Sequence, residues 1–419
     1  MTIFGSRRGF FSWTRNAMAA AGVSVATPSL AAVDTTRSAL AGGEDYYDKL
    51  GVSKIINAAG TFTALTASIM PPSVQAAVSN AAKYPVRLAE LQKRAGEYIA
   101  QRLMCDAALV SSGASAALTL GTAACMTVGN RPAARLLPLD VSGLKNEVIV
   151  QKSHRYGYDQ AIRNCGIRFV EVETLQQYEA AFTDRSVMCH FFNAAEQGQI
   201  TAEQWVAVAH RNGVPCFNDA AADVPPISNL WKFTRMGFDL VTFSGGKGLR
   251  GPQNAGLLLG RKDLIEAATW SNSPNSDSVG RGLKVAKEQI VGMVAAVDWI
   301  LAQDEGTIQA EFRQRADRIA AHLKDIPGLT PEIFVPPIAN VVPHLVLRCD
   351  PAKIGKTPIE ISEILRKSSP SIELNPWTGR KSAGAGTPEA ENAIVVGVWM
   401  LQPGEDMIVG RRLREVLSV

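Results

Sequence analysis

The chain has 419 residues, of which 46% are hydrophobic and 20% are charged. This is the composition of an ordinary globular protein, and the length predicts two or three domains. The 43 basic and 39 acidic residues give a net charge of +4 without a long basic block, which argues against a nucleic-acid partner. Beyond the N-terminal segment, no apolar stretch reaches the roughly 18 residues that a membrane-spanning helix needs.

The first 35 residues have the layout of an export signal. Arg7 and Arg8 stand before two aromatic residues, an alanine-rich stretch runs from Ala17 to Ala26, and small residues suited to cleavage lie near Ala31. This order is typical of a twin-arginine signal, which hands an already folded protein to the twin-arginine export machinery. We therefore expect residues 1–35 to be removed, a periplasmic mature protein, and no stable membrane span after cleavage. An ordinary basic N-terminus or an uncleaved anchor is the alternative.

We divide the remaining chain into three parts. Residues 36–80 are expected to form a linker and an N-terminal arm, because they are rich in small residues and turn signals. Residues 81–303 are expected to form a large domain, which opens with helical spacing from Leu88 to Leu103. Residues 304–419 are expected to form a smaller C-terminal domain.

Seven short apolar runs predict the strands of the large domain, and helical patterns such as Ala202–Arg211 separate most of them. The runs are Ala107–Val110, Val148–Val150, Phe169–Val172, Val187–Phe192, Val214–Phe217, Leu240–Phe243 and Gly256–Leu259. Strands that alternate with helices predict an α/β fold with a mostly parallel sheet.

The C-terminal part mixes helical and strand patterns, which predicts an α+β domain. A long helix is expected over Lys284–Gln303, ahead of this domain. Within the domain, further helices are expected over Gln309–Asp325, over Pro358–Lys367 and from Glu405 onward, and strands over Asn340–Leu347, Ile372–Leu374 and Ala393–Val398.

The six cysteines form no Cys-x-x-Cys pair, so the sequence does not predict a metal site. Several of them lie inside apolar runs, where a cysteine behaves as a small hydrophobic residue. We expect buried free thiols in preference to disulfides.

Lys247 is the strongest candidate for a catalytic residue in the sequence. It ends a Ser-Gly-Gly turn directly after the run Leu240–Phe243, and Asp219 follows an earlier run in the same way. A lysine and a carboxylate at strand ends are what pyridoxal phosphate chemistry needs, since the lysine amine forms the Schiff base and the carboxylate holds the pyridine nitrogen protonated. Ser112, His154 and Asn193 also follow strand ends, where parallel sheets bind ligands. Taken alone, a lysine on a glycine turn is more often a surface feature.

A second pattern favours a phosphate-binding site. Ser112, Gly113, Ala114 and Ser115 stand between a strand and a helix, where free N–H groups and the helix dipole attract an anion. Ser244 is a further hydroxyl donor for the same phosphate. The alternative is that Ser112 or Ser115 merely caps the helix. The pattern matches neither the nucleotide-triphosphate loop nor the dinucleotide-binding motif.

With these pieces in place, the chain resembles the fold-type I pyridoxal phosphate enzymes. More narrowly, it is similar to the branch related to bacterial selenocysteine synthase, which includes D-glucosaminate-6-phosphate ammonia-lyase. The segments that carry the resemblance are 51–61, 91–96, 112–118 and 244–253. It implies a three-layer sandwich with a mostly parallel seven-stranded sheet (aspartate aminotransferase-like), a smaller C-terminal domain, pyridoxal 5'-phosphate as cofactor, and a homodimer or higher homo-oligomer.

The resemblance also implies roles for individual residues. Lys247 corresponds to the Schiff-base lysine that moves protons at the substrate carbon, and Asp219 to the partner of the pyridine nitrogen. Asn193 stands where the family bonds the ring oxygen or the substrate. His154 stands where a group stacks on the ring, with a structural histidine as the alternative. The residues expected near the substrate are Thr61, Thr63, Arg250 and Arg348; Arg250 and Gln253 could instead face the phosphate, a neighbouring subunit or the solvent.

These observations predict a pyridoxal phosphate-dependent lyase that eliminates or deaminates an amino acid or amino sugar acid. An aminotransferase, aldolase or racemase is the first alternative, and a non-catalytic binding protein on this fold is the second. The stretch 395–399 lacks the arginine that many transaminases of this fold place there. Selenocysteine synthase carries an additional N-terminal tRNA-binding module, and here an export signal takes its place, so tRNA is not an expected substrate.

Overall fold

The computed structural model describes residues 44–194, 198–383 and 386–418. The predicted export signal therefore lies outside the described residues. The chain divides after Lys54 into two compact units. The described part of the first unit holds one short helix, α3 (Tyr46–Leu50), which Asp45 caps through its side chain. Among the described residues, none of the helices combines the length and the apolar character that crossing a membrane requires.

The second unit, residues 55–419, is built around a seven-stranded sheet with the strand order β2-β8-β7-β6-β5-β3-β4. Its strands are β2 (Ala107–Ser111), β3 (Glu147–Gln151), β4 (Arg168–Val172), β5 (Ser186–Phe192), β6 (Cys216–Asp219), β7 (Leu240–Ser244) and β8 (Gly256–Gly260). Strand β8 runs antiparallel to both of its neighbours, and the remaining pairs are parallel. Every predicted strand of this domain is present, and the mostly parallel α/β sheet is confirmed.

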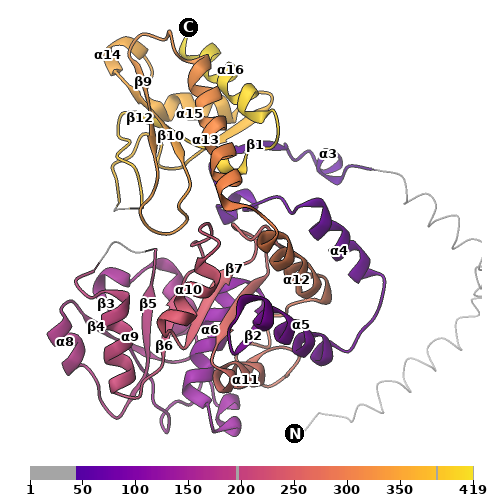
Figure 1. Ribbon diagram of the computed structural model, residues 1–419, viewed down its shortest axis with the longest axis vertical. Helices are drawn as coiled ribbons and strands as arrows, with labels where there is room; N and C mark the ends of the chain where they lie inside the picture. Colours follow the sequence, from indigo (N-terminus) through magenta and orange to yellow (C-terminus); the bar gives the residue numbers. More distant parts are fainter. Residues whose placement is uncertain (1–43, 195–197, 384–385, 419) are drawn as a thin grey trace, which may run out of the picture. The chain divides into compact units, whose positions relative to one another are not determined.

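Helices pack on both faces of this sheet, which makes a three-layer arrangement (Figure 1). Successive residues of a strand point to opposite faces, and on β3 Val148 and Ile149 accordingly belong to two different apolar clusters. The first cluster includes residues of α4 (Pro72–Ala82), α5 (Leu88–Leu103), α9 (Ala202–Arg211), α10 (Asn229–Met236) and α12 (Lys287–Leu301), with the short α8 (Leu175–Ala180) beside it. The second includes residues of α6 (Gly113–Thr127), α7 (Gln160–Arg163) and α11 (Lys262–Ser271).

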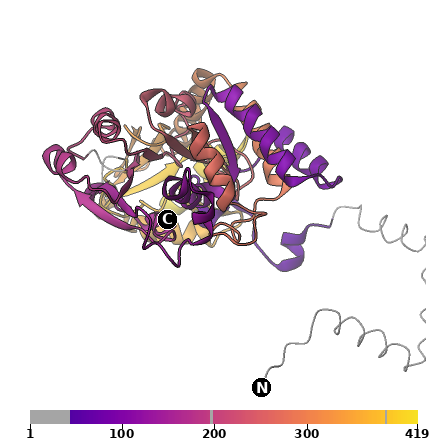
Figure 2. The ribbon, with the colours of Figure 1, turned by 90° about the horizontal axis from the view of Figure 1, so that it is seen from below.

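Helix α12 lies alongside α4 and α5 (Figure 2). This contact needs a small residue, because a β-carbon on Gly292 would lie 2.6 Å from the Pro252 ring and 2.7 Å from Val78. Leu88–Leu103 and Ala202–Arg211 form helices with the predicted bounds. In the second case Thr201 and Gln204 form a capping box, which fixes the start of α9.

The C-terminal part contains a three-stranded sheet and a two-stranded sheet. Its strands are β9 (Leu329–Phe334), β10 (His344–Cys349), β11 (Ser371–Leu374) and β12 (Ala393–Gly397), and its helices are α13 (Glu305–His322), α14 (Pro351–Ile354), α15 (Pro358–Arg366) and α16 (Glu405–Leu417). Strand β10 begins at His344, later than the predicted Asn340. The sequence missed β9, since this edge strand contains Pro331 and exposes its middle residues.

Strand β1 (Ile55–Ala58) pairs in parallel with β11, so this N-terminal segment belongs to the C-terminal sheets. Single turns of 3₁₀-helix complete the secondary structure at Thr63–Leu65, Arg131–Arg135, Lys152–His154, Gly157–Asp159 and Val398–Met400. All six cysteines are free, and all except Cys105 are buried, as expected. Because residues 55–419 pack as one unit, the division at residue 303 stays a prediction.

Candidate active site

The strand register brings the predicted residues to one edge of the large sheet. Asp219, the last residue of β6, lies between Phe192 on β5 and Thr242 on β7. Ser244, the last residue of β7, lies opposite Gly256 on β8. The carboxyl ends of β5, β6 and β7 therefore meet at one edge, which we call the carboxyl edge, and this is where such sheets bind ligands.

Lys247 projects from a turn that only glycine can build. A β-carbon on Gly248 would lie 1.9 Å from the Val224 carbonyl oxygen, and one on Gly246 would lie 2.5 Å from the Gln253 α-carbon. The Ser68 hydroxyl also donates a 2.7 Å hydrogen bond to the Gly246 carbonyl. The backbone on both sides of the lysine thus packs tightly against other backbone segments, and this packing fixes the position of the Lys247 α-carbon.

The Lys247 side chain is half-buried and lines a cavity, and the charges of two acidic residues act on its amine. Burial lowers its pKa, while the charges of Asp219 and Asp223 act in the opposite direction. A lowered pKa increases the fraction of neutral amine, the form that acts as a nucleophile and as a base.

Asp219 is buried and already holds two hydrogen bonds. It accepts from the Tyr156 hydroxyl and, at 3.0 Å, from the Ala221 backbone N–H. Burial raises the pKa of Asp219, and the Tyr156 hydrogen bond, the Ala221 N–H and the charge of Lys247 lower it. A carboxylate offers about four acceptor positions, so Asp219 can still accept a hydrogen bond from a ligand.

Asp223 is a second buried carboxyl group that the sequence analysis missed. Its side chain is fully buried, and within the described part of the chain neither of its oxygens has a hydrogen-bond partner of normal geometry. Burial raises its pKa to about 7, and the nearby charge of Asp219 adds to this, while Asn193 and Lys247 counteract it. The signal was present in the sequence, since Asp223 follows Asp219 after three alanines.

The predicted phosphate-binding segment, residues 112–115, which we call the phosphate cradle, lies at the junction of β2 and α6. Ser112 stands at the N-cap of α6 without a side-chain capping bond, so the N–H groups of the first helical turn are not satisfied by it. Gly113 has φ +84°, and space is open where its β-carbon would be. Gly256 packs against this turn so closely that a β-carbon would lie 2.5 Å from the Gly113 carbonyl carbon. Ser244 flanks Gly256 on the other side.

His154 is held by the protein around it. Its Nδ1 accepts a 3.2 Å hydrogen bond from the Phe192 N–H, and its ring meets Phe191 edge to face at 4.5 Å. Burial lowers its pKa to about 4, so the ring is neutral near pH 7. These contacts match the structural alternative for His154.

Tyr156 is the aromatic residue that reaches Asp219, and the sequence analysis did not name it. Its ring stacks on Phe192 with centroids 4.0 Å apart and an interplanar angle of 6°. Asn193 follows β5, and its backbone N–H donates to the Asp219 carbonyl at 3.2 Å. Its role toward the ring oxygen or the substrate stays a prediction.

A cavity of about 230 Å³ opens beside Lys247. Thr61 and Thr63 line it, as do several residues of the C-terminal part that the sequence analysis did not propose for the site: Asn340, His344, Asn375, Trp377 and Trp399. The loop that carries Thr61 is held by Asn57, whose amide donates to the Gly60 carbonyl and whose Oδ1 accepts from the Gly60 N–H, both at 3.0 Å.

Neither of the predicted arginines, Arg250 and Arg348, is among the residues that line this cavity. Arg250 donates to the Trp399 carbonyl at 2.9 Å, and burial lowers its pKa to about 10. Arg348 forms a two-bond ion pair with the exposed Glu332 and also donates to the Glu389 carbonyl. Both guanidinium groups bond to backbone carbonyls in this structure, and their roles toward the substrate, the phosphate or a neighbouring subunit stay predictions. Gln253 donates to the Thr63 carbonyl at 3.1 Å, so it supports the cavity loop.

Comparisons with known proteins agree with this architecture. The model of the L-seryl-tRNA selenium transferase family, SelA, matches residues 55–310. The chain belongs to this family. It is 27% identical to D-glucosaminate-6-phosphate ammonia lyase of Salmonella typhimurium over 88% of this chain and 97% of that protein. It is 29% identical to 5'-C-glycyluridine monooxygenase-decarboxylase of a Streptomyces species, over 88% of this chain and 92% of that protein.

The fold of this SelA-family chain also matches a solved structure of D-glucosaminate-6-phosphate ammonia-lyase. The TM-score is 0.76 at 26% identity, and the match covers 90% of this chain and 99% of that one. The aspartate aminotransferase-like fold with a smaller C-terminal part is thereby confirmed.

Enzymes of this family depend on pyridoxal phosphate, and the residues present fit that group. The first turn of α6 offers N–H groups for the phosphate, and Lys247 offers the amine. Asp219 has free acceptor positions for the pyridine nitrogen. Unpartnered buried atoms nearby, the two oxygens of Asp223 and Nε1 of Trp399, are the kind of polar group that a bound ligand satisfies.

Proposed function

We propose that the protein is a pyridoxal phosphate-dependent lyase that removes ammonia from an amino acid or amino sugar acid. The observation that carries the proposal is the Lys247 amine, which lies with two buried carboxyl groups beside a polar cavity and on the same sheet edge as a phosphate cradle. The extended similarity to an ammonia lyase supports the reaction class.

Each group has a task that its surroundings suit. When bound, the cofactor supplies an electron sink for the carbanion that forms at the substrate carbon. The Lys247 amine, with its pKa lowered by burial, takes the proton from that carbon and can return it. Asp219 accepts a hydrogen bond from the pyridine nitrogen, and Tyr156 and the Ala221 N–H orient its carboxylate.

The cavity lining favours a substrate with several hydroxyl groups. Threonine hydroxyls and the amides of Asn340 and Asn375 can hydrogen-bond to hydroxyls, and Trp377 and Trp399 offer flat apolar faces. Burial lowers the pKa of His344 to about 4, so this residue is neutral near pH 7 and also acts as a hydrogen-bonding group.

The test is an assay of the purified protein with pyridoxal phosphate and a panel of amino acids and amino sugar acids, including D-glucosaminate 6-phosphate. Ammonia and a keto acid in equal amounts, without pyridoxamine phosphate, are the expected products. Substrate-dependent pyridoxamine phosphate would instead indicate a transaminase. Oxygen uptake with release of CO₂ would indicate the chemistry named for the Streptomyces relative. A protein that binds no cofactor and turns over nothing would be a non-catalytic member of the family.

We further propose that the mature protein is periplasmic and forms a homodimer or larger homo-oligomer. The paired Arg7 and Arg8 support export, and the resemblance to fold-type I enzymes supports the oligomer. Replacing both arginines with lysine should trap the protein in the cytoplasm in cell fractionation. Light scattering of the purified protein should give at least twice the mass of one chain, and a monomer would contradict the oligomer.

A further inference from the structure

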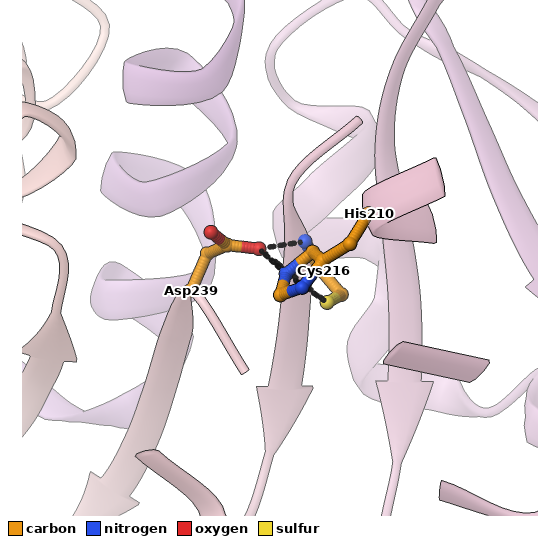
Figure 3. A group of neighbouring side chains, drawn as sticks. All are labelled: His210, Cys216 and Asp239. Carbon is orange, nitrogen blue, oxygen red and sulfur yellow. Dashed lines mark hydrogen bonds and ion pairs between the residues drawn. The ribbon is translucent and has the colours of Figure 1, made fainter. Parts of the chain in front are cut away.

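Three possible metal ligands converge at the opposite edge of the large sheet, where β6 and β7 begin. His210 lies in the last turn of α9, Cys216 is the first residue of β6, and Asp239 directly precedes β7 (Figure 3). The His210 Nε2 atom lies 3.0 Å from Asp239 Oδ2 and 3.7 Å from Cys216 Sγ, and Sγ lies 3.4 Å from Oδ2. We call these residues the amino-edge cluster.

These separations fit a tetrahedral zinc ion. Zinc binds sulfur at about 2.3 Å and histidine nitrogen or carboxylate oxygen at about 2.0–2.1 Å, so neighbouring ligand atoms in a tetrahedral site lie roughly 3.3–3.6 Å apart. Each distance in the cluster is within about 0.3 Å of that range. One thiolate, one imidazole and one carboxylate are also the ligand types that zinc and similar ions accept.

The surroundings orient these ligands and leave one direction open. Arg261 holds the other oxygen of Asp239 at 2.9 Å, and the Cys216 backbone N–H donates to Oδ2 at 2.8 Å. Such outer contacts fix a ligating carboxylate. The His210 side chain is 46% exposed and lines a cavity of about 290 Å³ together with Asp239 and Arg261, so the cluster is open to solvent on the His210 side, while Cys216 is buried beneath it.

We propose that His210, Cys216 and Asp239 bind a divalent transition-metal ion such as Zn²⁺, with water in the fourth position. On binding, the thiol loses its proton to solvent and Sγ bonds to the metal. His210 binds the metal through Nε2 as a neutral imidazole, whose single ring proton then sits on Nδ1, so the thiol proton is the only one released. Cys216 and Asp219 lie at opposite ends of β6, about 10 Å apart along the strand, so this site is separate from Lys247 and its cavity.

A metal here would join α9 to the strands that carry the active-site residues. The holo-protein should therefore bind one Zn²⁺ per chain in competition with a chromophoric chelator, and its melting temperature should rise with added Zn²⁺. Co²⁺ is the spectroscopic probe, because a thiolate ligand gives a sulfur-to-cobalt charge-transfer band in the near ultraviolet. The pyridoxal phosphate absorbance should stay unchanged throughout.

Two variants and one control decide the assignment. His210→Ala removes an accessible ligand, and Cys216→Ser replaces the buried sulfur with little change in shape; each should weaken Zn²⁺ binding at least about 10-fold and abolish the cobalt band. Cys105→Ser is the control, since Cys105 lines the same cavity but is not one of the three ligands. Binding that survives in both ligand variants, a cobalt complex without the thiolate band, or no binding to the parent protein would each overturn the proposal.

Discussion

Two buried aspartates at opposite edges of the sheet have very different surroundings. The carboxylate of Asp239, at the amino edge, has three polar partners within 3.0 Å: the Arg261 guanidinium, the His210 ring and the Cys216 N–H. Asp223, beyond the carboxyl end of β6, is fully buried, and within the described chain its oxygens have no hydrogen-bond partner of normal geometry, although the Asn193 side chain and Lys247 favour its charged form. At the amino edge the three possible metal ligand atoms converge on one point, an arrangement that suits a single ion. At the carboxyl edge unsatisfied groups are spread around a cavity, which suits an organic ligand with several polar atoms.

The largest effect should come from Lys247, the lysine that lines the cavity at the carboxyl edge. Lys247→Ala removes both the nucleophile and the proton-transfer group, so the lyase rate should fall by at least about 10³-fold. The absorbance of the lysine-bound cofactor should disappear with it. Lys262→Ala, at the exposed start of α11, is the matched control and should leave both unchanged. Activity retained by Lys247→Ala would refute the proposed mechanism.

A substitution next to the phosphate cradle should weaken the binding of pyridoxal phosphate more than it slows the reaction of the loaded enzyme. Gly256→Ala forces a methyl group to within 2.5 Å of the Gly113 backbone, which costs about 1–3 kcal/mol in strain. If the cradle holds the phosphate, the dissociation constant for pyridoxal phosphate should rise roughly 10-fold or more, since 1.4 kcal/mol is a factor of ten. Equilibrium titration of the apo-protein measures this. Gly143→Ala, which has open space around it, should bind normally.

The unpaired carboxyl group of Asp223 should give the apo-protein a pH-dependent weakness. Its folded-state pKa is raised to about 7 from an ordinary value of 3.8. The folded state therefore holds the proton more tightly, and stability falls as the pH rises from about 4 to 7. Asp223→Asn removes this loss. The free energy of unfolding of the variant, taken relative to that of the parent apo-protein, should therefore be higher at pH 8 than at pH 4 by up to roughly 4 kcal/mol.

Urea unfolding at the two pH values measures the Asp223 effect. Asp277→Asn, at an exposed aspartate, is the control and should show no such difference. Equal effects of Asp223→Asn at both pH values would mean that Asp223 is not protonated on folding.

The smallest effect should come from Thr201, which belongs neither to the candidate active site nor to the amino-edge cluster. Thr201→Ala removes the capping box of α9, the helix that ends near His210, and should lower the free energy of unfolding by about 1 kcal/mol. Lyase activity should remain. A marked loss of activity would mean that the start of α9 also shapes the active site.

Local patterns in the sequence predicted the large sheet and several residues of the candidate site. Alternation of short apolar runs with helical spacing is a local property, and it predicted all seven strands of the large sheet. Lys247 and Asp219 were proposed because each lies within four residues of the end of such a run. Ser112 and Gly113 were found in the same way, since strand, glycine and helix are neighbours in the chain.

The sequence by itself thus determined the α/β class, the lysine and carboxylate pair, and the position of the cradle. Only the tertiary structure decided which distant residues join them. The pairing of β1 with β11 brings Asn375 to the loop of Thr61, where it donates to the Ala59 carbonyl at 2.9 Å. The burial that leaves Asp223 unpaired and draws Arg250 to the Trp399 carbonyl also comes from packing. Such contacts link residues far apart in the chain, and no local periodicity encodes them.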